Sequence, residues 1–379
     1  MTKNNGPSLQ RNWLAFESGA TKELGSEYPL FTDAHVIGED SSSLGPYKLI
    51  NGRAWPANQE RPIQLLPGVV FRIDIYELNE DVSEKLKSTD FSSYHGGQIQ
   101  DEMAALLSLL TGRRFKAGGI SRVFFRGDDP EGTPFGGEGR PLELPYDINC
   151  KPVIPNARGE CNIENQHLLQ SVCKIDPTSL SALMVAARLY QQALWVCDES
   201  PEQSWLHFVS AIERAANSQA LISENPPESV KLWNEKLYHI VSKLESTDQE
   251  MAFKILAPIS GSTRKFVSFL TTYGPPVPHE RPTFAGLDWR KENLNKAFKT
   301  IYALRSKALH EGTPFPMPIC QPPYRANETT PYVEIPIGIA SATNNASWQH
   351  HELPMHLHVF EYIVRYSLIN WWQSLATNS

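Results

Sequence analysis

Two adjacent segments in the middle of the chain carry long stripes at helical spacing, and this pair constrains the fold more than any other feature. In the first segment the recurring residues are Leu180, Leu183, Met184, Ala187, Tyr190, Gln191 and Leu194. In the second they are Trp205, Phe208, Val209, Ile212 and Ala216. Residues repeating every three or four positions predict amphipathic helices. Each segment opens with a proline after a capping residue, at Asp176-Pro177 and Ser200-Pro201. Because the connection is short, the pair predicts an antiparallel helical hairpin.

Helical patterns continue after the hairpin. We expect further helices at 228–245, 249–258, 261–273, 288–308 and 354–376. The run Gly274-Pro275-Pro276 interrupts this series, because proline and glycine break helices. The proline-rich segment 314–336 is expected to be a covering loop or an extended connection.

The N-terminal part of the chain reads differently. Apolar residues alternate at 69, 71, 73 and 75, which predicts a half-buried strand, and 122–126 is a second strand candidate. Residues 100–111 predict a helix that ends at Gly112, and 127–160 is rich in glycine and proline. We therefore expect an α+β domain at 1–165, followed by an all-α domain at 166–379.

Composition narrows the class of protein. The chain has 379 residues and a formal net charge of -7, so any contact with nucleic acid must come from a local basic patch. Five scattered cysteines include no Cys-x-x-Cys pair, which fits a reducing compartment. We expect no signal peptide and no membrane span, because no apolar run approaches the roughly 18–20 residues that a span requires. The expectation is a soluble cytoplasmic protein.

One expected helix carries an arginine where its apolar stripe should continue. The stripe contains Leu294, Phe298, Ile301, Ala308 and Leu309, and it passes through Arg305. A guanidinium on the buried side of a helix is costly unless it is paired. We therefore expect Arg305 either to form a structural ion pair or to bind an anion in a cleft.

A histidine follows at the end of the same helix. His310 precedes Glu311-Gly312, and glycine is a common helix terminator. The two side chains are expected to lie on one face, near each other. Histidine suits general acid or base catalysis, and a neighbouring arginine can stabilise the extra charge on a pentavalent phosphate. The pair could thus drive attack of an RNA 2′-hydroxyl on the adjacent phosphate without a metal.

Basic residues concentrate on this helix. Between 289 and 310 there are six lysines and arginines and one acid, on a chain that is acidic as a whole. The RNA-binding candidates are Arg290, Lys296, Lys299 and Lys307. Such a surface can bind phosphate, although a solvated helix face gives the same pattern.

Two blocks of sequence resemble the HEPN superfamily, in particular the Apea-like HEPN group. The run Tyr302-Ala303-Leu304-Arg305-Ser306-Lys307, continued by His310-Glu311-Gly312, is similar to the core motif of that group. The hairpin segment with Ala211-Ile212-Glu213 resembles its paired first helices. The two blocks occur in the order and spacing of the family and cover about 175–315.

The resemblance implies a metal-independent endoribonuclease that needs no cofactor, often a toxin or an anti-phage abortive-infection effector. It implies a homodimer whose active site takes arginine and histidine from both subunits. Carried over, Arg305 would stabilise the phosphate, His310 would act as acid or base, and Glu213 would orient Arg305. Ser306 fills the polar position after the arginine, with an open role. RNA, with tRNA as one candidate, would be the substrate, and the N-terminal domain would sense a phage-derived or protein trigger.

Other interpretations stay open at this stage. Arg305 and Glu213 could form a structural pair with His310 as a helix-end cap, in a non-catalytic HEPN module that binds nucleotides or partners. The histidines at 350, 351, 356 and 358, with Glu352, could suggest zinc, but Pro354 interrupts them and an ordinary helix start is favoured, so no metal site is expected.

Overall fold

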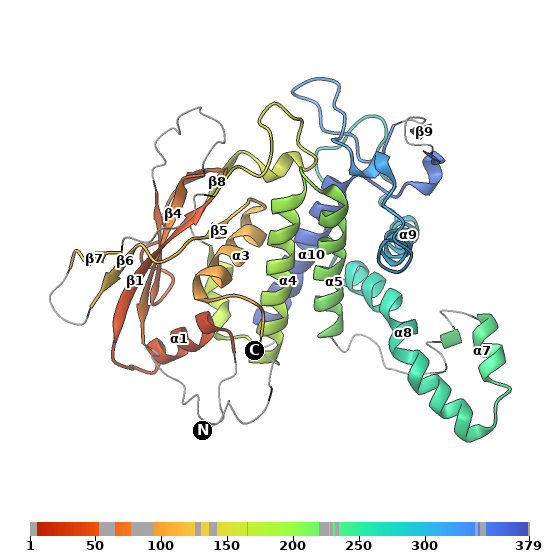
Figure 1. Ribbon diagram of the computed structural model, residues 1–379, viewed down its shortest axis with the longest axis horizontal. Coiled ribbons are helices and arrows are strands. Elements are labelled where there is room, and N and C mark those ends of the chain that lie inside the picture. The colour runs from red at the N-terminus through yellow and green to blue at the C-terminus, as the bar shows by residue number, and fades with distance from the viewer. Residues whose placement is uncertain are drawn as a thin grey trace. The chain divides into compact units, whose positions relative to one another are not determined.

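The computed structural model describes residues 6–52, 65–76, 89, 94–125, 130–135, 142–164, 166–219, 227, 230–231, 235–337, 340–341 and 346–377. The chain divides into two compact units, which are treated separately. The first unit comprises Met1–Ala211 with Leu368–Ser379, and the second comprises Ile212–Ser367. This division places 166–211, expected in the C-terminal domain, in the first unit. The expected N-terminal α+β region and helical C-terminal part are both present (Figure 1).

The first unit contains an antiparallel sheet. Its strand order is β3 (Tyr47–Asn51), β4 (Pro67–Ile75), β1 (Leu24–Phe31), β6 (Arg122–Phe124) and β7 (Thr133–Pro134), and β5 (Lys116–Ala117) also pairs with β1. A separate parallel pair joins β2 (His35–Ile37) to β8 (Glu160–Asn162). The alternation predicted for 69–75 is confirmed in β4, where Val69, Phe71 and Ile73 are fully buried.

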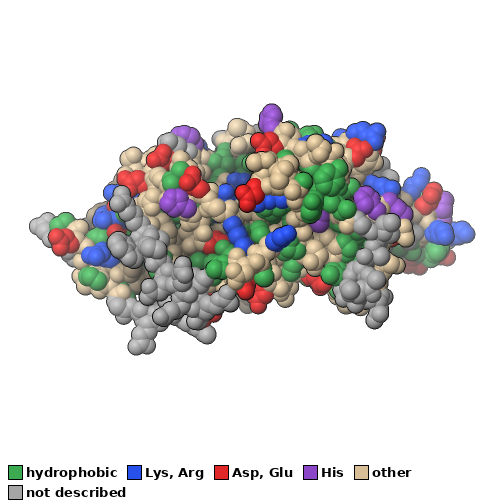
Figure 2. All heavy atoms as spheres, turned by 90° about the horizontal axis from the view of Figure 1, so that it is seen from above, with side chains coloured by type: hydrophobic (Ala, Val, Ile, Leu, Met, Phe, Trp, Pro, Cys, Tyr) green, Lys and Arg blue, Asp and Glu red, His purple; other side chains and the backbone are tan. Residues whose placement is uncertain are grey.

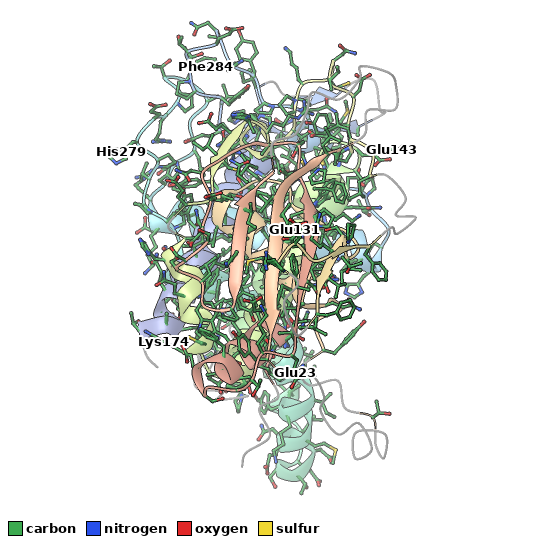
Figure 3. All side chains as sticks on the ribbon, turned by 90° about the vertical axis from the view of Figure 1, so that its left-hand side faces the viewer. Glu23, Glu131, Glu143, Lys174, His279 and Phe284 are labelled. Atoms are coloured by element: carbon green, nitrogen blue, oxygen red, sulfur yellow. The ribbon has the colours of Figure 1, made fainter. Side chains whose placement is uncertain are left out.

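Helices cover one side of this sheet. The helices of the first unit are α1 (Ser8–Glu17), α3 (Ile99–Thr111), α4 (Pro177–Val196), the 3-10 helix η2 (His167–Cys173), and parts of α5 (Pro201–Asn217) and α10 (Leu357–Thr377). Figure 1 shows α3 between the sheet and α4, and in Figure 3 the strands lie in front of the helices. As predicted, α3 ends at Gly112, whose φ of 69° lies in the left-handed region that glycine tolerates.

Two of the predicted helices form the expected hairpin. Asp176 caps α4 by accepting the backbone N–H of Ser179 at 2.9 Å, and Pro177 is its first residue. α4 and α5 contact each other through the rings of Tyr190 and Phe208, whose centroids are 5.5 Å apart. The predicted stripes are buried on both helices, so tertiary packing of the apolar faces stabilises the hairpin.

A buried carboxylate ties α3 to α1. Glu102 is fully buried and accepts the backbone N–H groups of Ser8 and Leu9 at 2.9 and 2.7 Å, while His95 Nε2 lies 2.7 Å from the same carboxylate. The first N–H groups of a helix lack partners within the helix, so Glu102 caps α1 from a neighbouring helix.

Among the described residues of the second unit, the regular structure is mostly helical, with one short strand pair. It contains α7 (Glu235–Val241), α8 (Ser246–Tyr273), α9 (Lys291–His310), the 3-10 helices η3 (Met317–Cys320) and η5 (His350–Glu352), and the strand pair β9 (Ala340–Ser341) and β10 (Ala346–Ser347). α8 packs against α7 and α9. The two helices predicted at 249–258 and 261–273 are one continuous helix, which corrects that prediction: the backbone runs through Pro258 and Gly261 because context outweighs local propensity.

Candidate functional site

The motif helix α9 buries one side. Ala297, Phe298, Ile301 and Tyr302 are buried, and the ring of Phe266 on α8 lies 5.2 Å from that of Tyr302. Arg305 follows Ile301 by four positions and Tyr302 by three, which places it on the same side of the helix. It is one-fifth exposed, so it lies at the edge of the buried side. The predicted stripe is wrong at Leu309, which is 51% exposed, because the last turn extends beyond the packing of α8.

Three side chains meet at this edge, and we call them the Glu213 cluster. Arg305 Nη2 donates to Glu213 Oε2 at 2.7 Å, and the Tyr302 hydroxyl donates to Glu213 Oε1 at 2.8 Å. The Arg305 guanidinium also lies 5.7 Å from the centre of the Tyr302 ring. Each carboxylate oxygen thus accepts one strong bond, which fixes the orientation of both donors. The arginine and the acid of the two sequence blocks are brought together.

Arg305 keeps donors that Glu213 does not use. A guanidinium has five N–H donors, and the bond to Glu213 takes one of them. Nε is buried and finds no acceptor among the described residues. Nε is shielded from a ligand by this burial, whereas the side chain as a whole is one-fifth exposed. An anion such as a phosphate can therefore reach Arg305 only through the exposed part of the side chain.

Tyr302 was not among the residues selected from the sequence. Burial, together with its hydrogen bond to Glu213, raises the pKa of Tyr302 to about 12. The phenol therefore keeps its proton near neutral pH and serves as a donor that orients Glu213. Its position three residues before Arg305, on the apolar side of the helix, is the signal that could have identified it.

His310 lies elsewhere on α9. The expectation that Arg305 and His310 share one face is wrong, because five residues turn a helix by about 500°, which leaves the two side chains about 140° apart. His310 is the last residue of α9 and is exposed, and it has no hydrogen-bonding partner within the described parts of the chain. One copy of α9 therefore presents its arginine and its histidine in different directions.

Three of the four RNA-binding candidates share the opposite face of α9. Lys296, Lys299 and Lys307 are exposed and, with His310, occupy positions that helical geometry places within about 80° of one another. We call these four residues the basic stripe. Figure 2 shows acidic and basic side chains interspersed over one face of the molecule, so positive charge does not dominate that face. The basic stripe is a narrow, local feature.

The remaining candidates are placed differently. Arg290 precedes α9 and forms an exposed pair with Asp288, through Nε at 2.9 Å and Nη2 at 2.5 Å, so its charge is already balanced. Ser306 is half-buried and makes no hydrogen bond to any residue that the structure describes. Its role stays a prediction.

In the basic run at 113–116, the central arginine does not lie on the surface. Arg114 is fully buried in the first unit, where its two terminal nitrogens lie 2.8 Å from Asp33 and 2.7 Å from Asp198. Arg158 also binds Asp198, at 3.0 Å. Two arginines and two aspartates thus form a buried, charge-balanced network that holds the unit together.

The C-terminal histidines do not form one cluster. His350 and His351 lie in η5 and are exposed, whereas His356 is buried and its ring centre lies 5.9 Å from that of His358. Within the described ranges, no group of three or more histidine, cysteine, aspartate or glutamate side chains is arranged to hold a metal ion.

Comparison of the chain with family models, with curated proteins and with solved structures finds no match. Over the described residues, the helices are too short or too polar to cross a bilayer.

Proposed function

We propose that the protein is a metal-independent endoribonuclease of the HEPN type, which binds single-stranded RNA along α9. The observation that carries the proposal is Arg305, which is one-fifth exposed and held by Glu213 through one of its five N–H donors. Arginine suits phosphate because its planar fork matches two oxygens at once. The basic stripe supplies positive charge on the same helix. The resemblance of the two sequence blocks to HEPN domains supports the same reaction class.

The proposed reaction is an in-line transesterification. The RNA 2′-oxygen forms a bond to the adjacent phosphorus, and its proton passes to His310. The bond from phosphorus to the 5′-oxygen breaks, and that oxygen is protonated as it leaves. The products are a 2′,3′-cyclic phosphate and a 5′-hydroxyl. Arg305 stabilises the additional negative charge on the phosphorane, and such electrostatic stabilisation is often a large contribution to catalysis.

A second copy of the chain completes the proposed site. Because Arg305 and His310 of one helix point about 140° apart, we propose that Arg305 of one subunit and His310 of the other act on the same phosphate. A mixture of Arg305→Ala and His310→Ala proteins tests this directly. In a symmetric dimer, half of the randomly mixed dimers hold one intact site, so about a quarter of wild-type activity should return. No recovery would show that the two residues act within one subunit, or not at all.

Cleavage itself is tested with a labelled single-stranded RNA, or with total tRNA, in the presence of EDTA. We expect cleavage to persist and to leave a 2′,3′-cyclic end. We expect either single variant to abolish it while the circular dichroism spectrum stays close to wild type; thermal unfolding should be unchanged in His310→Ala and only a few degrees lower in Arg305→Ala, which loses its pair with Glu213. Unchanged cleavage in both variants would rule out the proposal.

A cellular role as a toxin or an anti-phage effector follows from the same proposal. The N-terminal α+β region would respond to a phage-derived or protein trigger. Expression of the wild-type chain should then arrest growth, whereas the His310→Ala chain should not. Equal toxicity of both chains would separate any growth effect from the proposed chemistry.

The second candidate is a non-catalytic module that binds RNA or a partner. Two observations favour it: Glu213 neutralises the charge of Arg305, and His310 lies on another face of the helix. It predicts RNA binding without turnover, and binding that survives His310→Ala.

A further inference from the structure

A buried carboxylate organises the loop that precedes α9. Glu334 is 5% exposed and accepts Arg281 Nε at 3.1 Å, Arg281 Nη2 at 2.6 Å, the backbone N–H of Leu287 at 2.5 Å and Trp289 Nε1 at 3.3 Å. Four donors on one buried carboxylate hold the loop 281–289 in a single arrangement. A loop of this kind is unusually well fixed for a surface segment.

The same loop contains a strained residue. Ala285 has a φ of 51°, and within the described residues it is the non-glycine residue with a positive φ. Its carbonyl accepts the backbone N–H groups of Glu334 and Ile335 at 3.0 and 3.1 Å. A left-handed alanine persists only where the surroundings fix it, and such strain is common at binding sites. The residue immediately before it is Phe284.

Exposed aromatic side chains from two loops meet here. Phe284 is 47% exposed and Tyr324 is 52% exposed, with ring centroids 6.3 Å apart. The Arg325 guanidinium lies 4.9 Å from the ring centre of Tyr332. The backbone N–H of Val333 donates to the carbonyl of Tyr324 at 2.9 Å, which ties both aromatic positions of the second loop together. We call Phe284, Tyr324, Arg325 and Tyr332 the aromatic platform.

We propose that the aromatic platform binds an unpaired nucleobase of single-stranded RNA, an inference that rests on the proposed function. An exposed ring face stacks on any base, and a nearby guanidinium can contact the adjoining phosphate. Arg325 Nη1 donates to the carbonyl of Glu328 at 3.2 Å, which leaves further N–H donors for a ligand. Figure 3 shows Phe284 at the outer edge of that view, in keeping with its exposed ring.

The platform belongs to the same unit as α9: Phe284 lies in the loop before that helix, and Tyr324, Arg325 and Tyr332 follow it in the chain. At about 1.5 Å per residue, Arg305 lies about 21 Å along the helix axis from its first residue, Lys291. A single strand of several nucleotides is therefore needed to reach both the platform and the Glu213 cluster. The platform would select for unpaired bases and hold the strand, and it would leave the cleavage chemistry to the cluster.

The test is equilibrium binding of a fluorescent single strand of about twelve nucleotides, a length within the usual range of single-strand sites. The strand carries 2′-O-methyl groups, which block cleavage, and a second strand of the same length has an abasic backbone. We expect Phe284→Ala and Tyr324→Ala each to weaken binding of the base-bearing strand about fivefold or more, the effect of losing one stacked base. Binding of the abasic strand should not change.

Two controls separate stacking from folding. Phe284→Trp keeps a stacking surface and should retain binding, and Phe135→Ala removes an exposed phenylalanine of the first unit and should have no effect. If wild type binds RNA and both alanine variants bind equally well, the platform is wrong and the proposed function stands. An equal loss for the abasic strand, or preference for a proline-rich peptide over RNA, also overturns the platform. If wild type binds neither strand, the proposed function fails and the platform fails with it.

Discussion

Replacing Glu213 with glutamine separates the orienting role of this carboxylate from its contribution to stability. Glutamine keeps the shape, but its NH2 group replaces one of the two acceptor oxygens, so either Tyr302 or Arg305 faces another donor, and the negative charge is lost. A hydrogen bond to a charged group contributes about 1.5–3 kcal/mol when shielded. The Glu213 and Arg305 side chains are 19% and 20% exposed, so solvent screening reduces the expected net loss to about 1–2 kcal/mol. The melting temperature should fall by about 2–8 °C.

Glu213→Gln should affect RNA binding and RNA cleavage differently. Without the carboxylate, Arg305 loses its fixed position but also its neutralising partner. We therefore expect the RNA affinity to hold or to increase, while the cleavage rate falls about tenfold or more, equivalent to about 1.4 kcal/mol of activation free energy. Single-turnover kinetics and equilibrium binding measure the two separately. Glu202→Gln, an exposed acid on the same helix, is the matched control. A loss of stability with unchanged turnover would refute the reasoning and leave the Glu213 cluster as a structural tie.

Three further predictions concern charge. Replacing Lys296 or Lys307 with alanine should reduce the slope of the log RNA-binding constant against log salt concentration by about 0.7 for each lysine that contacts a phosphate. Arg290→Ala should change the slope less, because Arg290 is already paired with Asp288. Equal slopes for all three variants would contradict this. Arg114→Met should lower the unfolding free energy by about 3–5 kcal/mol in urea, since it removes the arginine that pairs with buried Asp33 and leaves Asp198 with Arg158 alone; a loss below about 1 kcal/mol would contradict the buried network. Burial lowers the pKa of His356 to about 4, so between about pH 6.5 and 4 the unfolded chain binds a proton at this residue and the folded chain does not. The free energy of unfolding should therefore fall as the pH drops from about 6.5 toward 4. A His356→Gln variant should show a smaller fall, and a pH profile identical to wild type would argue against this origin.

Much of the helical framework could be predicted because its signals are local. The stripes and the proline starts of α4 and α5 specify the hairpin within forty residues of sequence. Pairing of Glu213 with Arg305 could be anticipated too, since an arginine on a buried stripe demands an acid. In contrast, the single helix α8 could not be read from Pro258 and Gly261, because its packing against neighbours is not visible in local propensity.

The rest of the candidate site depends on contacts between distant residues. Arg281 and Glu334 are far apart in sequence and meet only in the folded unit, so neither the fixed loop nor the aromatic platform has a local signature. The face of His310 could have been derived from the sequence, since five positions along a helix never return to the same side. Arg114 illustrates the converse, because the central arginine of a basic run that looks like a surface patch is fully buried in the first unit.

The fixed geometry around Ala285 has a consequence for the speed of recognition. A loop already held by Glu334 does not need to order itself when a ligand arrives, so association would be limited by encounter and orientation rather than by rearrangement. Loss of an aromatic ring should then shorten the residence time of the ligand and leave the association rate nearly constant. Loosening the loop instead, with Glu334→Gln, should slow association as well, because the ligand must wait for the ring to adopt its binding position.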